Sequence, residues 1–324
     1  MTVLLTVTLL GLVAVEAPPP PGPLTPFGLL GDAQPYRPAP EHYAWISYLQ
    51  GTARDRTDSD TDYNVWELRA GAGGPLAASA PSTRDWQVDY TATAGWRVHQ
   101  DGSYDSADMF LTHGSFAPSA ALSLSRSWGV AARADLRFGD SRDGRVRFAP
   151  AGSAALVHDS GDRALLLGVS YATLTGDAIT EKRLLPLIEF HAIHGPGLRM
   201  VLGFPRTELY WSPRPSSDIS VRYRFPYDAE FRLAQELGVQ LGLELRGWNH
   251  ARAWAGWSES ERFYVQERGV ALMLGYRRET WRIQAGPALS FREEWHVGAR
   301  RDTAERIASV DEGLGLLLTG AVRF

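Results

Sequence analysis

Long runs of alternating apolar and polar residues are the main feature of this sequence. From Trp86 to Val98 the even positions are apolar, whereas the odd positions are mostly polar and include Asp89 and Arg97. A period of two indicates a strand with one apolar face and one wet face. A soluble β-sandwich also produces this alternation, so the period alone does not decide between water and membrane.

Aromatic residues recur ten positions apart on the apolar face of the three clearest strands. The pairs are Trp86 and Trp96, Trp128 and Phe138, and Trp281 and Phe291. At a tilt near 40°, ten residues rise roughly 25 Å, which is the height of the apolar band of a membrane barrel. Soluble strands usually run about five or six residues. We therefore predict that these six residues belong to two aromatic girdles at the membrane interfaces.

The C-terminal residues show a related pattern. Alternate positions from Leu314 to Val322 are apolar apart from Gly320, and the chain ends on Phe324. This resembles the terminal strand of bacterial outer-membrane β-barrel proteins, in which a final Phe is read by the assembly machinery. Gly320 stands where that face usually carries a larger side chain. The resemblance covers residues 41–324 as an architecture, and it implies three partners: outer-membrane lipid, lipopolysaccharide and the barrel assembly machinery, which would read Phe324.

The fold class follows from what a membrane permits. No uninterrupted apolar run reaches about 18 residues, so membrane-spanning helices are excluded. A bilayer core offers no water to satisfy backbone groups, which leaves a closed barrel as the spanning solution. We predict an all-β, antiparallel transmembrane barrel over residues 41–324 in the bacterial outer membrane. It has twelve to sixteen strands, with fourteen as the best estimate, short periplasmic turns and longer extracellular loops.

Some strands are clear and others are not. Segments near 238–248, 262–276, 281–292 and 313–324 read as strands, and the polar stretches 249–261 and 293–312 read as extracellular loops. Between Leu184 and Glu236 six prolines interrupt the pattern. Proline removes a donor from the strand ladder. Whether 198–211 forms one strand or two is left open.

The N-terminus reads as a targeting region. Residues 3–15 are apolar and precede Val15-Glu16-Ala17, a cleavage pattern of the signal-peptide type. We predict a signal peptide at 1–17, with a true start upstream because no basic residue follows Met1. Residues 18–40 are rich in proline and read as a periplasmic linker.

Composition excludes several function classes. The net charge is −4 and no long basic run occurs, so nucleic acid is not an expected partner. There is no cysteine for a disulfide or a thiolate metal site. Asp58, Asp60 and Asp62 alternate in the first outer loop, but Tyr63 occupies the glycine position of a calcium loop. Phosphate-binding, dinucleotide and metalloprotease motifs are missing from the sequence. We expect no cofactor and no metal.

The polar faces of the strands carry the candidate chemistry. We predict that eleven charged residues face the lumen: Asp89, Arg97, Arg133, Asp135, Arg137, Arg222, Arg224, Glu244, Arg246, Arg282 and Arg292. These side chains could line a water-filled channel or form ion pairs that brace a closed interior. Arginine outnumbers the carboxylates, which would favour anions in a channel. The leading prediction is a passive small-solute channel or a structural barrel.

An enzymatic alternative rests on His113 and Ser115. Outer-membrane phospholipases and lipid A deacylases place a His and a Ser two positions apart on a barrel strand, where the His can act as general base. This sequence is similar to them only at these two positions, and Phe116 stands where an Asn commonly follows. Alternation from the outward residues Leu122 and Leu124 places both residues inward, away from lipid, unless a bulge at Pro118 reverses the parity. Lipid hydrolysis is therefore the alternative function.

Overall fold

The protein is described by a computed structural model that covers most of the predicted barrel. It describes residues 42–55, 62–78, 86–101, 109–125, 127–140, 146–160, 162–172, 183–194, 197–214, 216–224, 228–238, 240–255, 262–278, 280–298 and 305–323, apart from some side chains within these ranges. The predicted signal peptide and linker lie outside the described residues.

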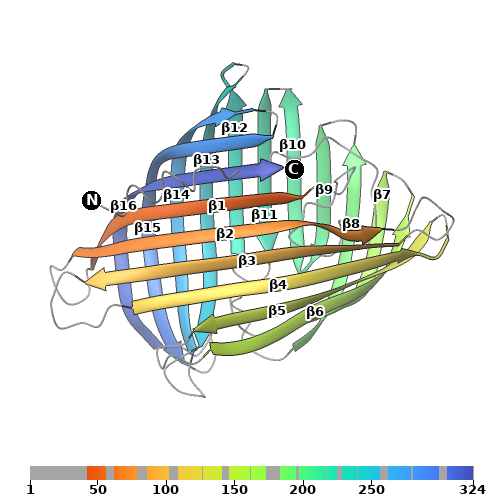
Figure 1. The fold of residues 1–324 in the computed structure, drawn as a ribbon, viewed down its shortest axis with the longest axis horizontal. Helices are drawn as coiled ribbons and strands as arrows, with labels where there is room; N and C mark the ends of the chain where they lie inside the picture. Colours follow the sequence, from red (N-terminus) through yellow and green to blue (C-terminus); the bar gives the residue numbers. More distant parts are fainter. Residues whose placement is uncertain are drawn as a thin grey trace.

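Within these residues, sixteen antiparallel strands close into one barrel (Figure 1). Each strand pairs with its sequence neighbours, and β1 pairs with β16 from Tyr43 opposite Arg323 onward. The strands are β1 (Tyr43–Asp55), β2 (Asp62–Ala78), β3 (Trp86–Asp101), β4 (Met109–Ser123), β5 (Trp128–Asp140), β6 (Val146–Asp159), β7 (Arg163–Ala172), β8 (Arg183–His194), β9 (Leu198–Phe204), β10 (Arg206–Arg214), β11 (Ser217–Arg224), β12 (Asp228–Glu236), β13 (Leu241–Ala255), β14 (Arg262–Arg277), β15 (Trp281–Gly298) and β16 (Glu305–Arg323).

The strand number is sixteen, so the best estimate of fourteen was too low. The segment left open forms two strands, because β9 ends at Phe204 and β10 begins at Arg206. They pair as a hairpin with Leu198 opposite Trp211. Pro205, which has no N–H to donate, occupies the single connecting position. Two short strands in a row carry too little alternation to be separated by sequence pattern.

The predicted extracellular loops near the C-terminus are largely strand. β13 continues to Ala255, β15 continues to Gly298 and β16 begins at Glu305. The prediction of loops at 249–261 and 293–312 was therefore wrong in part. Alternation of apolar side chains ends where the membrane ends, but backbone hydrogen bonds between strands do not need apolar side chains and continue into water.

The two ends of the barrel differ. The end that holds Tyr43 and Arg323 carries short connections such as 124–127, 160–162 and 278–280. The opposite end carries most of the long ones, for example 173–182, although Pro205 alone joins β9 to β10 there. Short periplasmic turns and longer extracellular loops are typical of outer-membrane barrels, so the chain termini mark the periplasmic end.

Large apolar side chains are exposed on the outer face of the barrel. Along β5, Leu136 is 54% exposed while its neighbour Asp135 is 7% exposed. The same contrast separates Leu274 from Met273 on β14. An apolar surface that encircles a protein in this way requires hydrocarbon rather than water as its solvent. Among the described residues, no helix is long and apolar enough to cross a membrane.

Candidate functional site: the charged lumen

A buried arginine joins four strands at the extracellular half of the lumen. The guanidinium of Arg97 on β3 donates from Nη1 to Glu67 Oε2 at 3.0 Å and to Glu267 Oε2 at 2.8 Å. Its Nη2 also donates to Glu293 on β15, and Arg69 pairs with Glu67. Arg97 is 2% exposed. One side chain therefore holds carboxylates from β2, β14 and β15, and we call these residues the Arg97 cluster.

The Arg97 cluster bridges one arc of six neighbouring strands, from β14 through β16 and β1 to β3, because the two strands in the middle of the arc contribute small residues there. β1 and β16 lie between β2 and β15 in the barrel wall. Gly51 on β1 faces Gly315 on β16 in register, and neither offers a side chain. Elsewhere, β5 and β13 stand opposite each other in the ring of strands and approach within 8 Å between Cα atoms. Both features narrow the interior.

A second charged group, the Glu244 cluster, follows β11 to β15 toward the periplasmic end. Glu244 is fully buried and accepts hydrogen bonds from Arg232 Nε and Arg282 Nη2, both at 2.7 Å, and from Gln284 Nε2 at 3.0 Å. Adjacent to it, Glu230 accepts from Arg222 Nη2 at 2.5 Å and lies 3.1 Å from Arg246 Nε. Arginines surround each carboxylate in this stretch of wall.

A third group lies on β8 to β10. Glu189 Oε2 is 2.9 Å from both His191 Nε2 and Arg206 Nη2. Gly203 on β9 pairs with Glu189 and has no side chain, so Arg206 can reach over β9 to the carboxylate. His191 on β8 is fully buried on the inner face of the barrel.

The predicted lumen residues have different surroundings. Arg97, Glu244, Arg246, Arg222 and Arg282 lie in the clusters above. Asp89 accepts from Gln87, Arg133 donates to Thr91 Oγ1 at 3.2 Å, and Asp135 is buried. The side chains of Arg137, Arg224 and Arg292 lie outside the described residues.

The predicted girdle residues mostly lie on the outer face. Trp86, Trp96, Trp128, Phe138 and Phe291 are exposed there, with values between 40% and 49%. Trp281 is half-buried, and its ring centroid lies 5.4 Å from that of Tyr276. Phe324 lies outside the described residues, so its role as an assembly signal stays a prediction.

Sequence reasoning missed several charged residues of the lumen, which are Glu67, Glu189, Arg206, Glu230, Arg232, Glu267 and Glu293. Glu67 lies between outward Trp66 and Leu68, so alternation in β2 could have found it. Glu293 could not be found in this way, because the ladder of β14 and β15 shifts between Arg268 and Gly269. That bulge moves the inward positions of β15 from even to odd numbers.

The candidate hydrolase pair is only partly described. The hydroxyl of Ser115 lies 2.8 Å from that of Thr93, on the inner face of β3 and β4, whereas Phe116 is exposed on the outer face. The His113 side chain lies outside the described residues. Ser115 thus points away from the lipid that such an enzyme would cleave.

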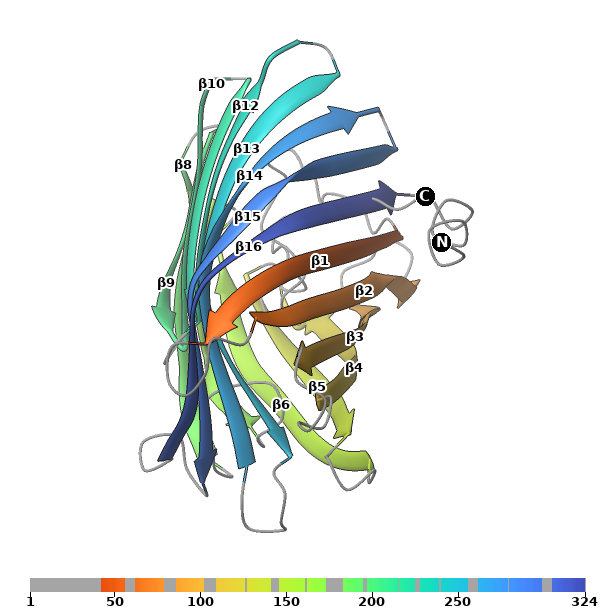
Figure 2. The ribbon, with the colours of Figure 1, turned by 90° about the vertical axis from the view of Figure 1, so that its left-hand side faces the viewer.

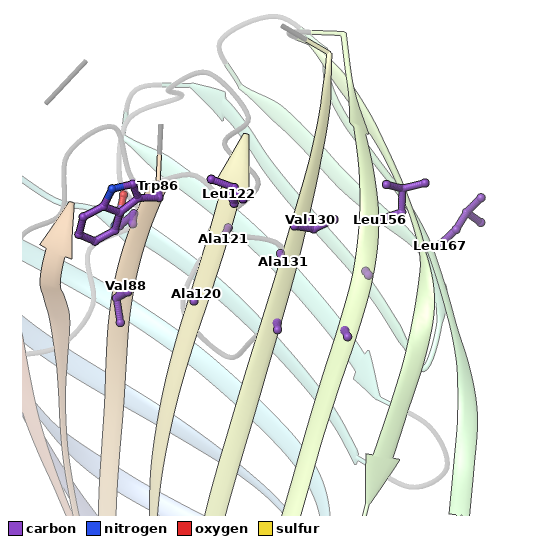
Figure 3. Close-up of a pocket in the computed structure, with 13 residues that line it drawn as sticks. Trp86, Val88, Ala120, Ala121, Leu122, Val130, Ala131, Leu156 and Leu167 are labelled. Carbon is purple, nitrogen blue, oxygen red and sulfur yellow. The ribbon is translucent and has the colours of Figure 1, made fainter. Parts of the chain in front are cut away.

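The outer face also carries a shallow apolar groove across β3 to β7 (Figure 3). Its floor includes Ala120, Ala132 and Ala154, which are neighbours in register on β4, β5 and β6. Larger side chains surround them, among them Trp86 and Leu156. Hydrocarbon chains fill a depression of this kind in an apolar membrane-facing surface, so the groove needs no specific ligand.

A closed antiparallel barrel with an apolar outer belt, exposed aromatic residues at its edges and ion pairs inside is the architecture of bacterial outer-membrane β-barrel proteins. The chain belongs to this structural class, and its place is the outer membrane.

Comparison with known proteins finds distant structural likenesses and no family. No protein-family model and no curated protein sequence matches the chain. Among solved structures, OccAB3 of Acinetobacter baumannii is similar at 7% identity and a TM-score of 0.40, over 88% of this chain and 99% of that chain. A mutant of the monoaromatic hydrocarbon channel TodX, a protein of Pseudomonas putida, has 10% identity and a TM-score of 0.40, over 89% and 91%. The β domain of the Bordetella autotransporter BrkA has 9% identity and a TM-score of 0.30, over 88% and 100%.

Proposed function

We propose that the protein is a passive channel for small solutes with a narrow, charged lumen. The observation that carries the proposal is a closed sixteen-strand wall lined by charged side chains. Barrels of about 16 to 18 strands leave space for water, and here we place that space on either side of the contact between β5 and β13.

The Arg97 cluster makes this channel narrow at its extracellular half. Its four charged members are buried on the inner face and join β2, β3, β14 and β15 across one arc of the wall. Solutes therefore pass beside or through this cluster, which restricts the channel to small ones. Ion pairs of this kind also brace the wall, so bracing and conduction are compatible functions of the same residues.

The Glu244 cluster and its neighbours set the electrostatics of the periplasmic half of the lumen. Arg222, Arg232, Arg246 and Arg282 face the carboxylates of Glu230 and Glu244, with Asp218 also nearby. Glu208 stands opposite Arg222 in register, so four guanidinium groups meet four carboxylates. Because a charged, narrow passage concentrates ions of opposite sign, a balanced lumen gives weak ion selectivity, and loss of arginines turns it toward cations.

Conductance in planar bilayers tests the channel and its selectivity. Purified protein should give stepwise ion currents, and a salt gradient should give a reversal potential near zero. The double variant R222Q/R246Q should shift that potential toward cation preference, because two positive lumenal charges are removed. R268Q is the matched control, since Arg268 is exposed on the outer face. A silent bilayer would reject the channel.

A variant at His113 tests the alternative function, lipid hydrolysis. If the protein is a channel, H113A should leave the lipid composition of outer membranes unchanged, because Ser115 contacts Thr93 on the inner face. The measurement is acyl-chain release from radiolabelled phospholipid by wild type and variant. An activity present in wild type and lost in H113A would favour the enzyme.

A further inference from the structure

The apolar groove on the outer face lies in the periplasmic half of the wall. Trp86, which lines it, is the first residue of β3, and Leu122 lies just before the short connection 124–127 at the periplasmic end. The groove has a volume of about 590 Å³ among the side chains labelled in Figure 3. Pockets that hold small ligands have volumes of about 300–1,000 Å³. The groove is therefore large enough for part of a lipid chain in the periplasmic leaflet.

A polar rim adjoins the groove on its periplasmic side. Val130 and Leu156, which line the groove, are partners in register, and the next outward pair toward the periplasm is Trp128 with His158. The centroids of these two rings are 4.6 Å apart in an edge-on arrangement. Tryptophan rings on a membrane protein lie at the level of the lipid headgroups. The imidazole of His158 is therefore held at headgroup depth, about 7 Å along the strand from the groove.

Two oppositely charged side chains complete the rim. Arg163 begins β7 two positions before Leu165, which pairs with His158. Its side chain is 67% exposed and lies on the outer face, because its neighbour Ala164 is buried on the inner face. The carboxylate of Asp162 is 65% exposed and lies 3.9 Å from Arg163 Nε. An exposed ion pair of this kind contributes little free energy, so both groups can bind other ions.

The rim matches a headgroup that carries both signs of charge. An arginine binds a phosphate through two parallel N–H groups, and the ring N–H of His158 supplies a further donor. The carboxylate of Asp162 attracts an ammonium group and repels a second negative charge. A primary ammonium can also donate hydrogen bonds to that carboxylate. A headgroup with a phosphate alone would be attracted by Arg163 and repelled by Asp162.

We propose that the groove and its rim bind one phospholipid of the periplasmic leaflet, whose headgroup carries a phosphate and a primary ammonium group. The phosphate contacts Arg163 and His158, the ammonium contacts Asp162, and an acyl chain lies over the alanines of the groove floor. Hydrocarbon from any lipid fills the groove, so the preference comes from the rim. The proposal goes beyond the channel and does not depend on conduction, because the headgroup contacts lie on the outer face and in a turn.

The β14–β15 hairpin provides a matched control. It also carries an exposed arginine at the periplasmic end, Arg278, whose Nε donates to the hydroxyl of Tyr276 at 3.2 Å. Large side chains form the outer surface beside it, since Leu274 and Ile283 are 55% and 43% exposed. Figure 2 shows β14 and β15 on a different part of the wall from β4 to β6. Arg278 therefore has the charge of Arg163 but lies away from the groove.

Native mass spectrometry tests the headgroup. Purified protein in detergent is offered equal amounts of phosphatidylethanolamine and phosphatidylglycerol. Wild type should retain one phosphatidylethanolamine at severalfold higher occupancy than phosphatidylglycerol. R163Q should lower that occupancy severalfold and R278Q should not, whereas D162N should remove the preference between the two lipids. Equal retention of both lipids by wild type, or equal effects of R163Q and R278Q, would overturn the proposal.

Photocrosslinking tests the groove. A phosphatidylethanolamine with a diazirine in one acyl chain should label β4 to β6 of wild type severalfold more than β14 and β15. A132L fills the groove floor and should remove this excess, whereas A285L adds the same side chain to the outer face of β15, opposite Leu274, and should leave it unchanged. Uniform labelling of the wall would overturn the proposal. A wild-type dimer that A132L dissociates would also overturn it, because a second copy of the chain would then occupy the groove.

Discussion

Replacement of Arg97 by alanine is expected to destabilise the barrel and to widen its conducting path. The change leaves Glu67, Glu267 and Glu293 buried without their shared partner. Breaking a buried ion pair by removing one partner costs about 3–5 kcal/mol. The free energy of unfolding, measured by urea titration of vesicle-bound protein, should fall by this amount. Single-channel conductance should rise severalfold, because the long side chain that bridges the inner faces of β3, β14 and β15 is gone.

Two companion variants isolate the cause. R222A removes another lumenal arginine, but Glu230 keeps Arg246 as partner and Arg222 is 37% exposed, so the loss of stability should be much smaller. Adding E67Q, E267Q and E293Q to R97A should recover much of the stability while conductance stays high, because the carboxylates no longer repel one another. Unchanged conductance in R97A would show that the Arg97 cluster does not restrict the passage.

An arginine at Ala132 is expected to produce the second large effect. Ala132 lies midway between Trp128 and Phe138 on the outer face of β5, on the recessed floor of the apolar groove. The new side chain meets no steric obstacle there, so its cost is that of a charge in hydrocarbon. For a barrel this is about 2–4 kcal/mol at the membrane midplane. Urea unfolding of A132R in vesicles should show this loss.

The matched control places the same charge outside hydrocarbon. Ser127 lies in the short connection between β4 and β5, at the periplasmic end. S127R should therefore change the free energy of unfolding by less than about 0.5 kcal/mol, as is usual for surface substitutions. Equal effects of A132R and S127R, or a wild-type protein that stays dissolved without detergent, would contradict a lipid-facing role for the outer belt.

Prediction from sequence succeeded where one physical rule governs many residues. Alternation in β3, β5 and β15 is enforced because a lipid-facing charge is costly, and it identified Trp96 and Phe138 as outward residues. Prediction failed where the alternation between apolar and polar residues is not enforced or is interrupted. Above the membrane both faces meet water, so the upper parts of β13 and β15 were read as loops. At the bulge beside Gly269 the ladder shifts, so Glu293 escaped detection.

Taken by itself, the sequence determined the class: a closed antiparallel barrel in the outer membrane, with apolar side chains outward and charges inward. The reason is that every membrane-spanning strand meets lipid on one face and the lumen on the other, so each strand by itself alternates between apolar and polar residues. Only the tertiary structure decided which charges meet. Arg97 and Glu293 are 196 positions apart, and closure of β1 on β16 brings them together. The contact of Arg206 with Glu189 over β9 likewise depends on how neighbouring strands pair, which no single segment records.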